Sequence, residues 1–149
     1  MIKTEWRDIA TLKRQPRNPK GHDLGSIHVA LDEFGFLLPL VLNRCTGNLV
    51  AGHGRLTCLQ QRKAAGRDPP ENIKVEGGAW LVPVNVIDIE PAQEEPVGLA
   101  LNRLSELGGW KDDTLAIVLA DLAQADRLRG TGYDVDDVDS LLAALGNEA

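Results

Sequence analysis

A hairpin followed at once by glycines and a helix is the feature that most constrains the fold of this chain. The apolar residues 40–42 and 49–51 flank the turn residues 46–48, which predicts two antiparallel strands. Gly52-His53-Gly54 follows the second strand directly. From Arg55 the apolar positions recur at helical spacing until Gly66, which predicts a helix over 55–65. The chain therefore turns sharply from a strand into a helix at residues 52–54.

Such a turn is suited to binding an anion. The first N–H groups of a helix have no partner within the helix, and the helix dipole adds partial positive charge there. Glycine lets the backbone approach phosphate oxygens closely, and Arg55 adds a bidentate cationic donor. The pattern predicts phosphate contacts from Gly52, Gly54 and Arg55, with His53 as a hydrogen-bond donor and candidate general acid or base. Glycines at this place are also common as plain turn residues, and that alternative remains open.

The rest of the pattern predicts an α+β fold with a small mixed sheet and flanking helices. Periodicity predicts a helix over 23–34 that ends at Gly35, and a strand over 80–89. Pro83 cannot donate to a strand ladder, so we expect this strand at a sheet edge or at a bulge. After residue 90 the pattern is helical. We expect a core of residues 1–90 and a helical C-terminal extension, residues 91–149, packed on that core.

The overall charge argues against a protein that binds nucleic acid over its whole surface. The 149 residues carry a formal net charge of -6, whereas neutralising phosphates needs an excess of Lys and Arg. Residues 1–20 are locally basic, which leaves DNA contact through this segment as a hypothesis. The cationic residues of this segment are Lys3, Arg7, Lys13, Arg14, Arg17 and Lys20.

Cysteine usage and hydropathy predict a cytoplasmic protein that does not enter a membrane. Cys45 and Cys58 make no disulfide framework and fit a reducing compartment. The first residues lack an apolar run like that of a signal peptide, and no run approaches the roughly 20 residues of a membrane helix. The spacing of Cys45, His53 and Cys58 is not that of zinc ligands, so no metal-binding residues are predicted.

Several short segments together resemble the ParB/sulfiredoxin superfamily. They are FGFLLPLVL at residues 34–42, TGNLVAGHGRLTCLQ at 46–60, the Asn18-Pro19 pair and LVPV at 81–84. The likeness extends to ParB-like domains that occur alone or fused to phage-type DNA methyltransferases, through LNRLSEL at 101–107, Trp110 and TGYD at 131–134. The segments are moderately specific together and weak singly.

The resemblance implies a site for a nucleoside triphosphate with Mg²⁺. It places Gly52, Gly54 and Arg55 against the phosphates, and it lines the pocket with Arg17, Asn18, Asn102 and Arg103. His53 stands where sulfiredoxin has its catalytic cysteine, which argues against sulfiredoxin chemistry. A related serine kinase uses a glutamate as base in the region of Glu33, so Glu33 is a candidate base; a solvated helix residue is the alternative.

Three functions follow as hypotheses. The first is a nucleotide-binding accessory or regulatory domain in phage or plasmid DNA metabolism, with a DNA-modifying protein as a possible partner and an oligomer as a possible state. The second is an NTPase, kinase or metal-dependent nuclease that uses the same pocket, although no carboxylate cluster at the loop supports a two-metal site. The third is a protein-interaction module whose pocket has decayed.

Overall fold

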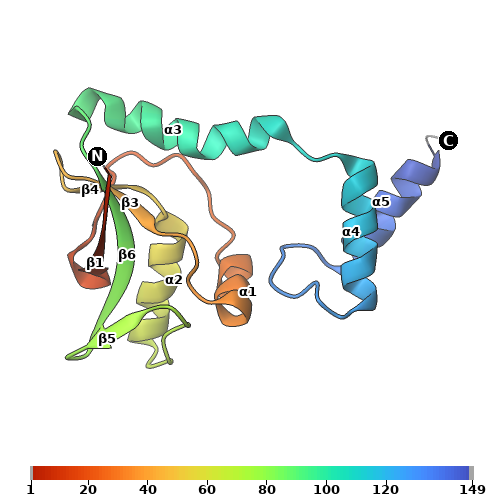
Figure 1. Cartoon of the computed structure of the whole chain (residues 1–149), viewed down its shortest axis with the longest axis horizontal. Coiled ribbons are helices and arrows are strands. Elements are labelled where there is room, and N and C mark those ends of the chain that lie inside the picture. The colour runs from red at the N-terminus through yellow and green to blue at the C-terminus, as the bar shows by residue number, and fades with distance from the viewer. Residues whose placement is uncertain (1, 148–149) are drawn as a thin grey trace.

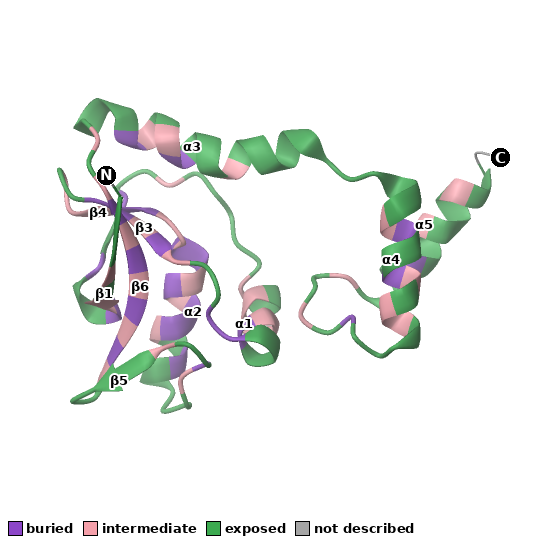
Figure 2. Cartoon of the chain, viewed as in Figure 1, coloured by how far each residue is buried: buried purple, intermediate pink, exposed green. Residues whose placement is uncertain are grey.

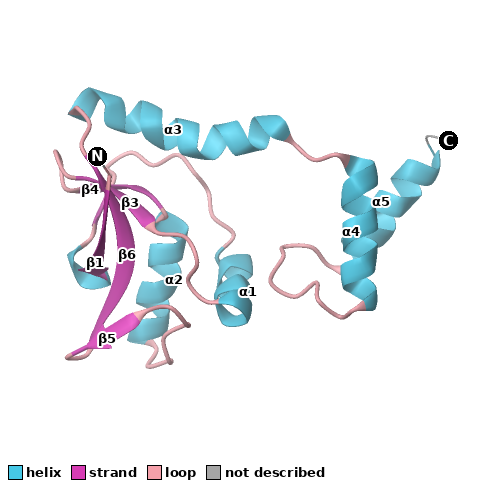
Figure 3. Ribbon diagram, viewed as in Figure 1, coloured by secondary structure: helices cyan, strands magenta, loops and turns pink. Residues whose placement is uncertain are grey.

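The computed structural model describes residues 2–147 and has the expected α+β architecture (Figure 3). One mixed sheet runs in the order β1-β6-β3-β4-β2, and β5 pairs with the start of β6. The neighbours β3 and β6 are parallel, as are β2 and β4, whereas the other pairs are antiparallel. The strands are β1 Lys3–Asp8, β2 Lys13–Arg14, β3 Leu40–Asn43, β4 Asn48–Ala51, β5 Lys74–Glu76 and β6 Ala79–Ile87.

The helices divide between the sheet and an arm that leads away from it (Figure 1). Two of them lie beside the sheet, and the third runs across the strand ends near β4 and reaches the last two helices. Their bounds are α1 Leu24–Phe34, α2 His53–Ala64, α3 Pro91–Gly108, α4 Asp112–Gln124 and α5 Val135–Asn147, with a short 3-10 turn at Ile9–Thr11. The hairpin of β3 and β4, the helix after it and the helical C-terminal part are therefore confirmed.

The main core lies between the sheet and the helices α1 and α2. Alternate residues of β6, from Trp80 to Val86, are buried, and α2 presents Leu56, Cys58 and Leu59 to them (Figure 2). Burial raises the pKa of the Cys58 thiol, and its sulfur donates to the carbonyl of Leu24 at 3.6 Å. Burial of these apolar side chains stabilises the packing of α2 against the sheet.

The expectation that Pro83 marks a sheet edge or a bulge is wrong: the pairing of β6 with β1 runs through Pro83 without a shift of register. The strand β6 lies inside the sheet, with β1 along one side and both β5 and β3 along the other. On the second side, pairing with β5 ends at Leu81 and pairing with β3 begins at Val84. Pro83 falls into the gap between these two partners, so its missing N–H removes no bond from that side.

A buried glutamate fastens α3 to the hairpin. Glu94 accepts hydrogen bonds from Asn43 at 3.1 Å, from Asn48 at 3.1 Å and from the Thr46 hydroxyl. Burial acts to raise the pKa of Glu94, but the three hydrogen bonds outweigh it and hold this pKa below its ordinary value. The start of α3 is thereby held over the turn between β3 and β4.

Replacing Glu94 by alanine is expected to lower the free energy of unfolding by about 2 kcal/mol, because three polar groups lose their buried acceptor. Since the folded-state pKa is depressed, the stability that Glu94 contributes is present at neutral pH and disappears as the pH falls through the range where carboxyls protonate. Urea unfolding at several pH values checks this. If the variant and the parent lose stability equally between neutral and acidic pH, Glu94 is not the responsible group.

The last two helices form a second, smaller apolar cluster. Leu119 of α4 packs with Leu128 and with Val138 of α5. The connection between α4 and α5 returns to α1, where Gly130 lies against Phe34: a Cβ added at Gly130 would come within 2.8 Å of the Phe34 ring. The division into a 1–90 core with a packed extension remains a prediction.

None of the helices within residues 2–147 combines the length and the apolar character that crossing a membrane requires.

Candidate functional site

The first turn of α2 is built around Gly52. Its φ is +99°, a left-handed conformation that side chains rarely adopt, and its carbonyl accepts from the N–H of Leu56 at 3.0 Å. A Cβ at Gly52 would overlap the Leu40 side chain, and it would lie 3.2 Å from Nη2 of Arg55. Glycine is therefore required here by both conformation and space, as expected for the tight turn.

Arg55 curls back beside this turn. Its Nη1 donates to the carbonyl of Leu38, and its guanidinium lies 5.3 Å from the centre of the Phe36 ring. Burial lowers the pKa of Arg55. No carboxylate among residues 2–147 lies within ion-pair distance of this guanidinium. The charge thus stays next to Gly52, although the guanidinium is turned toward the loop before β3.

Arg14 flanks the same turn from β2. It donates to the carbonyl of His53 at 3.3 Å, to the hydroxyl of Thr57 at 2.8 Å and to Oε1 of Gln60 at 2.8 Å. All three acceptors are neutral, and within the described part of the chain Arg14 forms no ion pair. Arg14 and Arg55 therefore place two uncompensated positive charges around the N-terminus of α2.

The His53 side chain lies inside the protein and is 5% exposed. Its Nε2 accepts the backbone N–H of Gln15 at 3.2 Å. Burial, followed by the charges of Arg14 and His22, lowers the pKa of His53, against a smaller opposing effect of a hydrogen bond with the Leu49 backbone. A neutral imidazole whose Nε2 is already an acceptor holds the segment before α1 against α2; its role as a donor or as general acid or base remains a prediction.

A pocket of about 220 Å³ lies between the segment 15–20 and α3. It brings together four residues that the sequence assigned to nucleotide binding: Arg17, Asn18, Asn102 and Arg103. The remaining lining residues are Gln15, Pro19, Lys20, Glu95, Gly98, Leu99 and Glu106. None of Gly52, His53, Gly54 and Arg55 lines this pocket, so the predicted residues form two neighbouring groups.

The cations at the pocket rim are paired with glutamates of α3. Arg17 bonds Glu95 at 2.6 Å and Lys20 bonds Glu106 at 3.4 Å. Arg103 bonds the same Glu106 at 3.2 Å. These pairs are solvent-exposed and therefore weak, so an incoming anion can compete for the cations. Asn102 donates to the carbonyl of Gly98 at 2.9 Å, one turn back along α3.

Gln15 lines the pocket and was not predicted from the sequence. It is only 7% exposed, and its carboxamide lies beside Gly98, where an added Cβ would be 3.2 Å from Oε1. In residues 2–147 this carboxamide makes no hydrogen bond, yet no buried polar side-chain atom there lacks a partner. Its polar atoms consequently remain open to the pocket. No local pattern marks a lone glutamine after a two-residue strand, so only the structure reveals it.

The segment 15–22 lies between the pocket and the first turn of α2 and contacts both. The main chain of Gln15 binds His53 on one side, whereas its side chain lines the pocket on the other. Further along, the ring of His22 lies directly over Gly54, because a Cβ added there would meet Cγ and Nδ1 of His22 at 2.8 Å. The pocket and the first turn of α2 thus share one wall.

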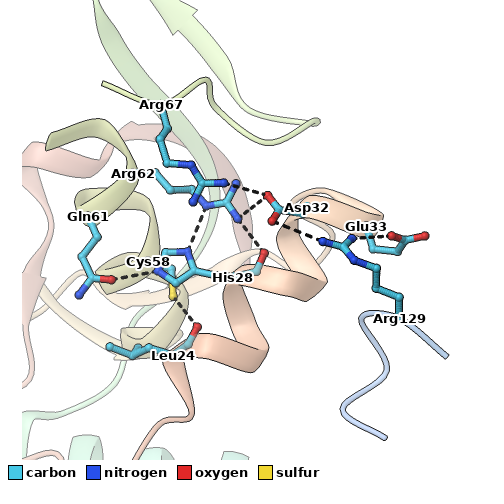
Figure 4. A network of polar contacts seen from close by, with 9 residues as sticks. All are labelled: Leu24, His28, Asp32, Glu33, Cys58, Gln61, Arg62, Arg67 and Arg129. Atoms are coloured by element: carbon cyan, nitrogen blue, oxygen red, sulfur yellow. Dashed lines mark hydrogen bonds and ion pairs between the residues drawn. The ribbon is translucent and has the colours of Figure 1, made fainter. Parts of the chain in front are cut away.

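Glu33 lies elsewhere, in a network of ion pairs (Figure 4). It binds Arg129 at 2.7 Å, and Arg129 also lies 3.9 Å from Asp32. Asp32 in turn holds the buried Arg62 at 2.7 Å, which donates to the carbonyl of His28 at 2.7 Å. The structure does not bring Glu33 to the pocket; it places this carboxylate where it ties the connection between α4 and α5 to α1.

Within the described residues there is no group of three His, Cys, Asp or Glu side chains placed to hold a metal ion. Mg²⁺ commonly binds through one or two carboxylates together with substrate phosphates.

Comparison with known proteins gives matches among solved structures alone. No family model and no curated protein matches the chain. Among the solved structures it is similar to the C-terminally truncated chromosome-partitioning protein ParB from Caulobacter crescentus in complex with CTP-gamma-S, at 22% identity and a TM-score of 0.48, over 67% of this chain and 52% of that one. It is also similar to a Pnob8-like ParB-N domain, at 17% identity and a TM-score of 0.49, over 86% of this chain and 50% of the other. The chain spans about half the length of each.

Proposed function

We propose that this chain binds a nucleoside triphosphate, with the phosphates at the first turn of α2 and the remainder of the ligand in the neighbouring pocket. The observation that carries the proposal is the pair of guanidinium groups, Arg14 and Arg55, that flank this turn without a carboxylate partner. Unpaired helix N–H groups and uncompensated positive charge favour an anion of high charge. Gly52 and Gly54 add no side chain at this turn, which Leu40 and His22 already approach closely.

The pocket supports the same ligand class. An open carboxamide at Gln15 can both donate and accept, as recognition of a base or sugar requires, and the walls include Leu99 and Pro19. At the rim, Arg17 and Arg103 are held by exposed ion pairs that a phosphate can displace. Mg²⁺ would accompany the phosphates.

Calorimetric titration with CTP, UTP, ATP and GTP, with and without Mg²⁺, tests the proposal. Arg55→Ala and Arg14→Ala are each expected to weaken binding at least about tenfold, the cost of about 1.4 kcal/mol for one charged hydrogen bond. Arg44→Ala is the matched control, because Arg44 forms an exposed ion pair with Asp88 away from the site. Absence of binding by the parent protein, or equal affinity in all variants, would contradict the proposal.

We also propose that the chain acts in phage or plasmid DNA metabolism, in the cytoplasm and with a DNA-modifying partner. Its likeness to the methyltransferase-associated ParB-like domains is part of the same proposal. Steady release of phosphate, or metal-dependent cutting of plasmid DNA, would identify the enzyme alternative. DNA contact through the N-terminal segment stays a hypothesis: Arg7, Arg17 and Lys20 form exposed ion pairs, which a phosphate group can displace.

A protein-interaction role is a second candidate, favoured by the surface of α3. Large apolar side chains stand exposed along its second half and just beyond: Leu101, Leu104, Leu107 and Trp110. Contiguous exposed apolar side chains often mark an interaction surface. Sedimentation of the full chain across a concentration series tests whether this surface joins two copies.

A further inference from the structure

We infer that His22 is a phosphate-binding residue of this site, taking the space in front of the first turn of α2 that a side chain at residue 54 would otherwise fill. The inference rests on the proposed function and adds a residue and a pH response to it.

The geometry around Gly54 is the first support. The His22 ring is so close that a Cβ on Gly54 would come within 2.8 Å of both Cγ and Nδ1, and within 2.9 Å of Cδ1 of Ile27. Any larger residue at 54 would displace the ring. The imidazole therefore packs against the first turn of α2, and His22 as a residue is exposed to solvent.

The surroundings of His22 are cationic. Lys20 lies on the same segment and Arg14 comes from β2, whereas the nearby His53 of α2 is neutral. The contact from α1 is the apolar Ile27, and Asp23, the next residue, uses its carboxylate to cap α1 through Ser26. Burial, then Lys20 and Arg14, lowers the pKa of His22, so the ring is neutral at neutral pH. On the same segment, the nearly buried carboxamide of Gln15 faces the neighbouring pocket.

An incoming phosphate reverses this balance. Its negative charge offsets the cations around His22 and favours the protonated ring, which then donates a charged hydrogen bond. Binding consequently takes up a proton. The affinity for phosphate rises as the pH falls from the pKa of the His22 ring in the complex to its lower pKa in the free protein. Below both pKa values the affinity no longer changes.

Inorganic tripolyphosphate is the probe, since it offers phosphate without a base. Calorimetry from about pH 6 to about pH 8 compares the parent with His22→Gln. In His22→Gln, residue 22 no longer titrates, so the pH dependence that comes from the ligand itself is measured separately. We expect the parent to gain about fivefold in affinity at the acidic end relative to His22→Gln, and to take up protons measured in buffers of different ionisation enthalpy. His22→Arg, which is permanently charged, should bind at the basic end as tightly as the parent does at the acidic end.

Histidine NMR provides a readout that a purely structural role would not move. Tripolyphosphate is expected to shift the titration midpoint of the His22 ring upward, while the His28 signal, from a ring bonded to Gln61 at the other end of α2, does not respond. If the parent binds and His22→Gln shows the same pH dependence, the role of His22 is refuted and the proposed function stands. If the parent binds neither tripolyphosphate nor any nucleotide, the proposed function itself fails, and this inference with it.

Discussion

The Gly52→Ala variant is expected to be less stable than the parent by about 3 kcal/mol. A left-handed conformation costs a non-glycine residue about 1–2 kcal/mol, and φ here is +99°. The added methyl group would also overlap Leu40, which is fully buried in β3 and cannot move aside without disturbing the sheet. Overpacking of this kind costs about another 1–3 kcal/mol.

Urea unfolding of Gly52→Ala and of Gly66→Ala separates the cost of the positive φ from the cost of the overlap with Leu40. Gly66 also has a positive φ, +72°, but a Cβ there would meet no atom within 4 Å. Gly66→Ala is therefore expected to lose only about 1 kcal/mol, the conformational part alone. Equal losses in the two variants would mean that the contact with Leu40 does not constrain the turn.

The Arg62→Ala variant is expected to lose about 3 kcal/mol of unfolding free energy. Arg62 is 3% exposed and joins α2 to α1 through Asp32 and the carbonyl of His28 (Figure 4). Removing this buried guanidinium is costly, because the half-buried Asp32 and the carbonyl of His28 both lose their donor. The aliphatic part of the side chain is lost from the packing as well.

Arg67→Ala is the matched control for Arg62→Ala. Arg67 approaches the same carboxylate of Asp32 at 3.5 Å, but its side chain is 51% exposed. An exposed pair contributes about 0–1 kcal/mol, so Arg67→Ala should unfold almost as the parent does. Thermal and urea unfolding of the three proteins decide the point: a large loss in both variants would show that the charge on Asp32, and not burial, sets the energy.

Local patterns of the sequence predicted much of the fold. The hairpin, the glycine turn and the helix after it depend on neighbouring residues, and the structure has them where expected. The alternation of β6 likewise shows directly which side chains are buried. The position of β6 inside the sheet was not predictable in this way, because it depends on β1, β3 and β5 pairing from distant parts of the chain.

The candidate site was predictable in its residue types and only partly in its geometry. Arg17 and Asn102, far apart in the sequence, do line one pocket. The direction of Arg55 was not predictable, since it depends on the Leu38 carbonyl and the Phe36 ring. The same holds for His22, whose place over Gly54 follows from the path of the loop before α1.

The walls of the pocket and of the adjoining helix turn come from residues 14–22, 52–55 and 95–106, and these stretches meet through sheet pairing and the Glu94 anchor. The binding surface is complete only when all three stretches are in place. Ligand affinity and native-state population are thus thermodynamically linked. A ligand present at about a hundred times its dissociation constant would add about 2.7 kcal/mol to the folded form. A thermal-shift screen of the intact chain can therefore find the physiological ligand without any assumption about its chemistry.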